Sequence, residues 1–136
     1  MKISVLHPAA RPLQLAAAIT AWYRTFSSVA DVGSELQYVV CYHAEQAAEF
    51  AGSAPLEPLR ARYEGLIFLV NSGPNHPTLN GRSSFVDNAN CAARASVGDV
   101  LVLAADDLEP PEGWDSLIVQ AIESRAGAPL RALSDG

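Results

Sequence analysis

A continuous apolar run that ends at two adjacent carboxylates constrains this chain more than any other feature. Residues 100–105 are all apolar, Asp106 and Asp107 follow directly, and Pro110 and Pro111 prevent the segment from continuing as a strand. Such a run is typical of a strand covered on both faces in a parallel sheet. We therefore expect the carboxylates at the carboxyl edge of a buried strand. Ligands bind at that edge in open α/β sheets, and paired carboxylates suit a divalent cation that contacts phosphate oxygens.

Length and charge limit the class of protein. The 136 residues suffice for one domain, and the 49% of hydrophobic and 18% of charged residues argue against disorder and against a coiled coil. The formal net charge of -6 provides no basic stripe, so we expect no nucleic-acid partner. No apolar run has the length of a membrane span or a signal-peptide core, and we expect a cytoplasmic protein. Cys41 and Cys91 suggest neither a disulfide framework nor a metal site.

Predicted strands and helices alternate along the chain. Strands are expected at residues 3–6, 36–42, 65–70 and 100–105, and a fifth is expected to begin near residue 129. Helices are expected at 13–26, at 46–51, from a cap at Ser84 to a stop at Gly98, and after Trp114. The first of these helices should bury Leu15, Ile19, Trp22 and Phe26. The last should bury Leu117, Ile118, Ala121 and Ile122. This alternation predicts an α/β fold with three α/β/α layers and a mainly parallel sheet.

Several segments, in order, resemble the inverting family-2-type glycosyltransferases of the GT-A fold. They are His7-Pro8 and Arg11-Pro12 after the first strand, Asn90, Ala95-Ser96-Val97-Gly98-Asp99, Ala105-Asp106-Asp107, and Pro111-Glu112-Gly113-Trp114-Asp115. The resemblance covers nearly the whole chain, and its most specific part runs from Asn90 to Asp115. It implies that residues 1–136 form a single GT-A-like domain, the Rossmann-like half that binds a nucleotide sugar.

The resemblance also implies site residues. Asp107 would coordinate Mn²⁺ or Mg²⁺ bridging the diphosphate, and Asp106 would contact the ribose or join the metal shell. A cation there would stabilise, as a Lewis acid, the charge that builds on the leaving nucleoside diphosphate. The implied nucleotide-sugar contacts are Pro8, Ala9, Arg11, His43, Arg82, Asn90 and Asp106. Arg82 lies in a long polar loop from residue 71 to 83, a kind of segment that usually has a function.

The chain departs from the family pattern at several positions. Ala105 stands where many members have a further Asp, and Ala9 stands where Thr is frequent. His43 stands where the family usually places an Asp that binds the base, which leaves the base preference open. Ala132-Leu133-Ser134-Asp135-Gly136 resembles the strand that opens the acceptor-binding half, so we expect that half, with its general base, to be missing. No catalytic residue is therefore assigned.

Two functions of different classes follow from these features. The first is transfer of a sugar to an unidentified hydroxyl acceptor with inversion. The second is a non-catalytic nucleotide-binding or oligomeric assembly module of the same fold, in which a sheet edge pairs with a second copy or another chain. A nucleotidyltransferase-like or other doubly wound binder is a third possibility. A dinucleotide enzyme is disfavoured because no G-x-G-x-x-G follows the first strand.

The candidate residues also have ordinary structural interpretations. The two aspartates suit a solvated turn, and Arg11 a surface charge. His7 and His43 suit the polar ends of strands, and Asn90 suits a hydrogen bond to nearby backbone. The histidines lack the spacing of a zinc site. Trp114 is expected in the core or an interface, and Asp115 as a charge favoured at a helix start.

Overall fold

The computed structural model describes residues 1–27, 35–73 and 85–125. Within these ranges the strands are β1 (Lys2–Pro8), β2 (Glu35–His43), β3 (Leu66–Asn71) and β4 (Val100–Leu103). The helices are α1 (Pro12–Thr25), the 3₁₀ helix η1 (Ala44–Gln46), α2 (Ala47–Ala51), α3 (Glu57–Arg62), α4 (Phe85–Ala95) and α5 (Trp114–Arg125). No helix in these ranges is long and apolar enough to cross a membrane.

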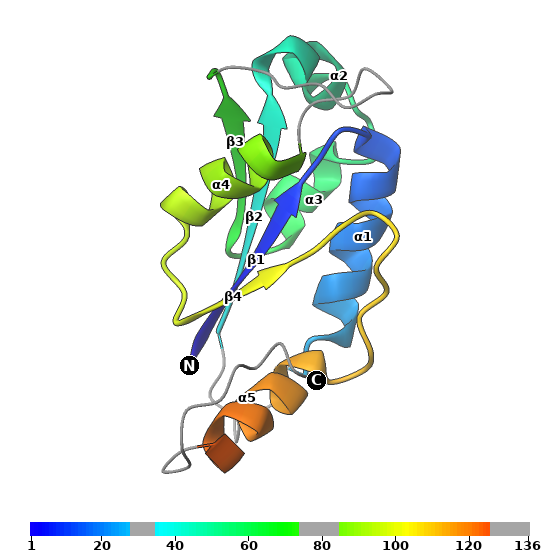
Figure 1. The fold of residues 1–136 in the computed structure, drawn as a ribbon. Coiled ribbons are helices and arrows are strands. Elements are labelled where there is room, and N and C mark those ends of the chain that lie inside the picture. The colour runs from blue at the N-terminus through cyan, green and yellow to red at the C-terminus, as the bar shows by residue number, and fades with distance from the viewer. Residues whose placement is uncertain (28–34, 74–84, 126–136) are drawn as a thin grey trace.

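All four strands are parallel and stand in the order β3-β2-β1-β4. The chain lays β1, β2 and β3 side by side in one direction and then returns to place β4 on the free side of β1 (Figure 1). The strand order therefore reverses between β1 and β4. In doubly wound folds, the crevice beyond the carboxyl ends of the strands at such a reversal is where ligands bind.

Helices cover both faces of the sheet (Figure 1). On one face, side chains of β1 and β2 form a core with Leu15, Ile19 and Trp22 of α1 and with residues of α2 and α3. On the other face, α4 crosses the sheet, and its Ala92 packs against residues of β1 and β2. The fold is thus a three-layer α/β/α arrangement of Rossmann-like type, which confirms the predicted fold class. Cys41 and Cys91 are both free thiols, as expected.

The first strand extends two residues past its predicted end, through His7 and Pro8. Alternate residues of β1 bond to opposite neighbours: the Ala9 amide donates to the Cys41 carbonyl of β2, whereas the Leu6 carbonyl accepts from Ala104, just after β4. The nitrogen of Pro8 therefore faces the β4 side, where that strand has already ended. Because no ladder hydrogen bond is lost there, proline is tolerated at this position.

The fourth strand is shorter and less covered than the sequence predicts. It ends at Leu103, and Leu101 and Leu103 are 48% and 49% exposed. The prediction of a strand buried on both faces was wrong because α4 packs over β1, β2 and β3, whereas β4 lies at the edge of the described sheet.

The buried face of the last helix also differs from the prediction. Leu117, Ala121 and Ile122 are exposed, whereas Trp114, Asp115 and Val119 are buried. The reason is polar anchoring of the helix start to the end of α1.

Two side chains provide this anchoring. The Trp114 indole nitrogen donates to the Trp22 carbonyl at 3.1 Å, and the Asp115 carboxylate accepts from the backbone amide (2.8 Å) and the hydroxyl (2.5 Å) of Ser27. Trp114 is a core residue, as predicted. Asp115 is a buried tether between α5 and α1, not only a helix-start charge. The predicted cap Ser84, the loop residues 74–83 and the predicted fifth strand lie outside the described residues.

Gly98 provides a test of the junction before β4. A methyl group on Gly98 would stand 2.5 Å from the Ser4 hydroxyl and 2.7 Å from the Ser4 amide. We expect Gly98→Ala to lower the free energy of unfolding by about 1–3 kcal/mol, because β1 and β4 must separate to admit it. Urea denaturation measures this change.

Gly52→Ala is the matched control. Gly52 has an ordinary φ of -87°, and its added methyl would meet the Ala48 carbonyl oxygen at 3.3 Å. We expect a change below about 1 kcal/mol for this variant. Equal stability of the two variants would contradict the steric account.

Candidate functional site

Three side chains meet at the carboxyl edge, where the strand order reverses between β1 and β4. Asp106, in the turn after β4, accepts a hydrogen bond from His7 Nε2 at 2.8 Å through Oδ1. Its Oδ2 lies 3.0 Å from both Nε and Nη2 of Arg11. His7 is the second-to-last residue of β1, and Arg11 immediately precedes α1. The structure thus brings together two predicted site residues, Arg11 and Asp106, around a histidine. We call Tyr38, His7, Asp106 and Arg11 the edge cluster.

Backbone contacts hold the loops that carry this cluster. The Leu108 amide donates to the Ala105 carbonyl at 3.2 Å and closes the turn that contains Asp106. On the opposite side, the Ala9 amide bonds to the Cys41 carbonyl at 2.9 Å, and the Gln46 side chain donates to the Ala10 carbonyl at 3.0 Å. The loop between β1 and α1 is therefore tied to the end of β2 and to η1, which fixes the position of Arg11.

The cluster continues into the protein interior through Tyr38. The Tyr38 hydroxyl lies 2.7 Å from His7 Nδ1, and both side chains are fully buried. An ionised carboxylate only accepts hydrogen bonds, so His7 Nε2 carries the hydrogen that faces Asp106. In neutral His7, Nδ1 is then an acceptor for the Tyr38 hydroxyl. No polar atom of this buried imidazole is left without a partner.

Electrostatics keep Asp106 ionised. Burial pushes its pKa upward, but the hydrogen bonds and charges of His7 and Arg11 outweigh this effect, so the pKa falls below its usual 3.8. Burial, and next the charge of Asp106, raises the pKa of Tyr38 well above 10.0. At neutral pH the cluster therefore presents a carboxylate, a guanidinium and a protonated phenol.

The other predicted site residues lie in different settings. Pro8 and Ala9 are buried beside the cluster, between His7 and Arg11 in the chain. His43 is buried and has both nitrogens engaged: Nδ1 accepts from the Glu45 amide at 3.1 Å, and Nε2 donates to the Gly73 carbonyl at 3.0 Å. These are the bonds of a polar strand end and of the cap of η1.

Two further predicted residues are exposed, and one is outside the described ranges. Asn90 is exposed on α4. A different residue of that helix, Asn88, bonds to β3: its side-chain oxygen accepts a hydrogen bond from the Asn71 side-chain amide at 3.2 Å. Asp107 is also exposed. Arg82 lies outside the described residues.

Sequence reasoning did not assign His7 or Tyr38 to the site. His7 was interpreted as a strand end, and Tyr38 lies within an apolar strand segment, where tyrosine is an ordinary core residue. The only sequence signal was a histidine close to the end of the first strand. The bond between His7 and Asp106 joins positions 99 residues apart, so local sequence patterns cannot reveal it.

The donor set fits a divalent cation only in part. His7 and Arg11 engage both oxygens of Asp106, while Asp107 is exposed beside it. No group of three or more His, Cys, Asp or Glu side chains in the described ranges is arranged to hold a metal ion. Magnesium, however, is commonly held by one or two carboxylates together with substrate phosphates. An exposed carboxylate such as Asp107 is of the type that such a shared site uses, with the other ligands supplied by substrate phosphates and water.

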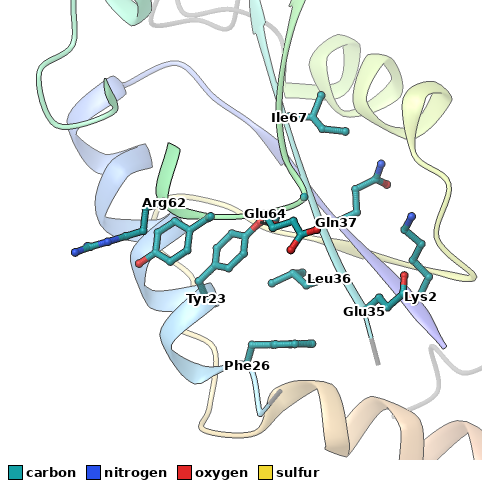
Figure 2. A pocket seen from close by; sticks show the side chains of 11 residues that line it. Lys2, Tyr23, Phe26, Glu35, Leu36, Gln37, Arg62, Glu64 and Ile67 are labelled. Carbon is teal, nitrogen blue, oxygen red and sulfur yellow. Dashed lines mark hydrogen bonds between the residues drawn. The ribbon is translucent and has the colours of Figure 1, made fainter. Parts of the chain in front are cut away.

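A groove lies at the opposite edge of the sheet (Figure 2). It has a volume of about 590 Å³, and Tyr23, Phe26 and Leu36 line it together with charged residues such as Lys2 and Arg62. It lies at the amino ends of β1, β2 and β3 and contains none of the predicted site residues. We take the edge cluster as the candidate site because ligands of this fold bind at the carboxyl edge.

Comparisons with known proteins found no matching family model, no matching curated protein and no matching solved structure. The candidate site therefore rests on the position and chemistry of its own residues.

The lowered pKa of Asp106 makes a prediction about stability and pH. Its ionised form is favoured in the folded state, so the contribution is complete above the unfolded pKa near 4 and is lost as pH falls through the lower folded pKa. We expect Asp106→Asn to lower the free energy of unfolding by about 1–3 kcal/mol at pH 7. The difference from wild type should shrink below about pH 4.

Guanidinium denaturation of both proteins between pH 3 and 7 measures this difference. Asp107→Asn removes a neighbouring carboxylate that is exposed, and should change stability by less than about 0.5 kcal/mol. A pH-independent effect of Asp106→Asn would show that its charge does not stabilise the fold.

Proposed function

We propose that this chain binds a nucleoside-diphosphate sugar with a divalent cation at the carboxyl edge between β1 and β4, and transfers the sugar to a hydroxyl acceptor with inversion. The observation that carries this proposal is the meeting of Arg11, His7 and Asp106 where the strand order reverses. The resemblance of residues 90–115 to family-2-type glycosyltransferases agrees with this location.

Arg11 is the residue best suited to contact the diphosphate. Its side chain is 40% exposed, its charge is permanent, and its guanidinium already faces outward at the edge of the sheet. Phosphate oxygens would compete with Asp106 for its donors. Asp106 keeps its bond to His7 in either case and has lone pairs left for a ribose hydroxyl.

Asp107 is the proposed protein ligand of Mn²⁺ or Mg²⁺. It is exposed next to Asp106 in the turn after β4. The bound cation would supply Lewis-acid stabilisation of the charge on the departing diphosphate. We assign no general base among the described residues.

Calorimetric titration with UDP, GDP and their sugar conjugates, with and without Mn²⁺, tests the proposal. We expect one nucleotide series to bind in a metal-dependent way, and Asp107→Ala to remove the metal dependence because the cation loses its protein ligand. Glu123→Ala, which removes an exposed carboxylate from α5, is the matched control and should bind like wild type. If a folded wild-type protein binds none of these nucleotides, the proposal is wrong.

A second candidate function is a non-catalytic assembly module in which β4 pairs with a second copy. The observation that favours it is the place of β4 at the edge of the described sheet, with half-exposed Leu101 and Leu103 on one of its faces. Exposed apolar edge strands are ready-made pairing surfaces. Metal-dependent nucleotide binding without transfer would agree with this function.

Sedimentation across a range of protein concentrations tests this alternative. It predicts a dimer that Leu103→Glu disrupts, because a buried unpaired carboxylate disfavours the contact. Leu117→Glu places the same change at an exposed leucine of α5 and should leave the dimer intact. A wild-type protein that is monomeric at every concentration would exclude pairing through β4.

A further inference from the structure

A chain of hydrogen bonds connects the sheet interior to the surface of the candidate site. It runs from the Tyr38 hydroxyl to His7 Nδ1 (2.7 Å), from His7 Nε2 to Asp106 Oδ1 (2.8 Å), and from Asp106 Oδ2 to Arg11 Nε (3.0 Å). Exposure increases along the chain: Tyr38 and His7 are fully buried, the Asp106 side chain is 14% exposed, and that of Arg11 is 40% exposed. The two outer residues are those that can contact a ligand.

The inner end of this chain determines whether the His7 ring can keep its orientation. The ring reaches Asp106 through Nε2 only while Nδ1 points inward, and the Tyr38 hydroxyl is the partner that Nδ1 finds there. A hydroxyl can donate to neutral Nδ1 and accept from protonated Nδ1–H, so the same orientation is satisfied in both protonation states of His7. Without that hydroxyl, a fully buried nitrogen would have no partner in this orientation.

We propose that Tyr38 is a positioning residue of the ligand site: through His7 it fixes the Asp106 carboxylate, and through Asp106 the guanidinium of Arg11. Tyr38 reaches the site only through other side chains, as outer-shell partners of ligating histidines do. Its ring packs against Tyr23, with centroids 6.0 Å apart. Tyr38→Phe therefore keeps this packing and removes a single oxygen atom.

Tyr42→Phe is the matched control for this substitution. Tyr42 lies four residues further along β2 on the same face, is buried, and stacks on Phe50 at 4.2 Å. Its ring belongs to the same core, but no bond of the edge cluster involves its hydroxyl. Tyr42→Phe therefore removes a phenol oxygen from the same face of β2 and leaves every bond of the edge cluster in place.

The first experiment measures the cluster by NMR without any ligand, so it is independent of the proposed function. In wild type, the imidazole ¹⁵N spectrum should show a hydrogen on His7 Nε2. The Asp106 carboxyl ¹³C chemical shift at pH 7 is the second signal. In Tyr38→Phe we expect both the His7 Nδ1 signal and the Asp106 carboxyl signal to shift, because the ring no longer holds the carboxylate. Tyr42→Phe should match wild type in both signals.

Two results would overturn the proposal. One is a wild-type His7 whose Nε2 carries no hydrogen, a measurement that does not depend on any variant folding. The other is a folded Tyr38→Phe protein whose His7 and Asp106 signals are unchanged.

The second experiment rests on the proposed function. Affinity for UDP with Mn²⁺ should fall ~10-fold in Tyr38→Phe and stay unchanged in Tyr42→Phe, as is typical for loss of an outer-shell partner. Equal affinity of Tyr38→Phe and wild type would refute the positioning of Arg11. Failure of wild type to bind any nucleotide would instead reject the proposed function, while the ligand-free spectra still decide the role of Tyr38.

Discussion

The rest of this structure depends on the position of β1 between β2 and β4. Its odd-numbered residues bond to β2 and its even-numbered residues to β4, so β1 is paired on both sides up to the point where β4 ends. Side chains reinforce the same junction: the Ser4 hydroxyl donates to Gln37 at 2.6 Å and accepts from the Gly98 amide at 2.9 Å. Glycine at position 98 is what lets the connection after α4 approach β1 this closely.

The same register explains why the candidate site lies at the carboxyl edge. β1 extends past the point where its pairing with β4 ends, so His7 lies in the part of β1 that pairs with β2 alone. β4 ends at Leu103, and Asp106 lies in the turn that follows it. A fully buried histidine needs partners for both nitrogens, and Tyr38 and Asp106 supply them. The carboxylate that satisfies this histidine is also the one we propose for ligand contact, which distinguishes Asp106 from its exposed neighbour Asp107.

The two aspartates differ in their electrostatic surroundings. Asp106 is surrounded by cationic or hydrogen-bond-donating groups and suits contact with neutral or donor groups of a ligand, whereas Asp107 faces solvent, where a hydrated cation can approach it. The Arg11 side chain is 40% exposed, and its guanidinium can bind a phosphate in place of the Asp106 carboxylate. Within this arrangement, Tyr38 controls the site from the interior without touching a ligand.

The sequence by itself determined the elements and the class of fold. Its alternating apolar runs and breaks located β1 to β4, α1, α2 and α4 to within a few residues, and they placed the Asp106-Asp107 pair beyond the last strand. It did not determine strand order, the half-exposed faces of β4 and α5, or the bonds among His7, Tyr38 and Asp106. Periodicity reports only which residues are neighbours along one element, whereas those features depend on which elements pack together. Only the tertiary structure decided that a core tyrosine, a strand-end histidine and a turn aspartate form one hydrogen-bonded cluster, because their contacts join strands that are distant in the chain.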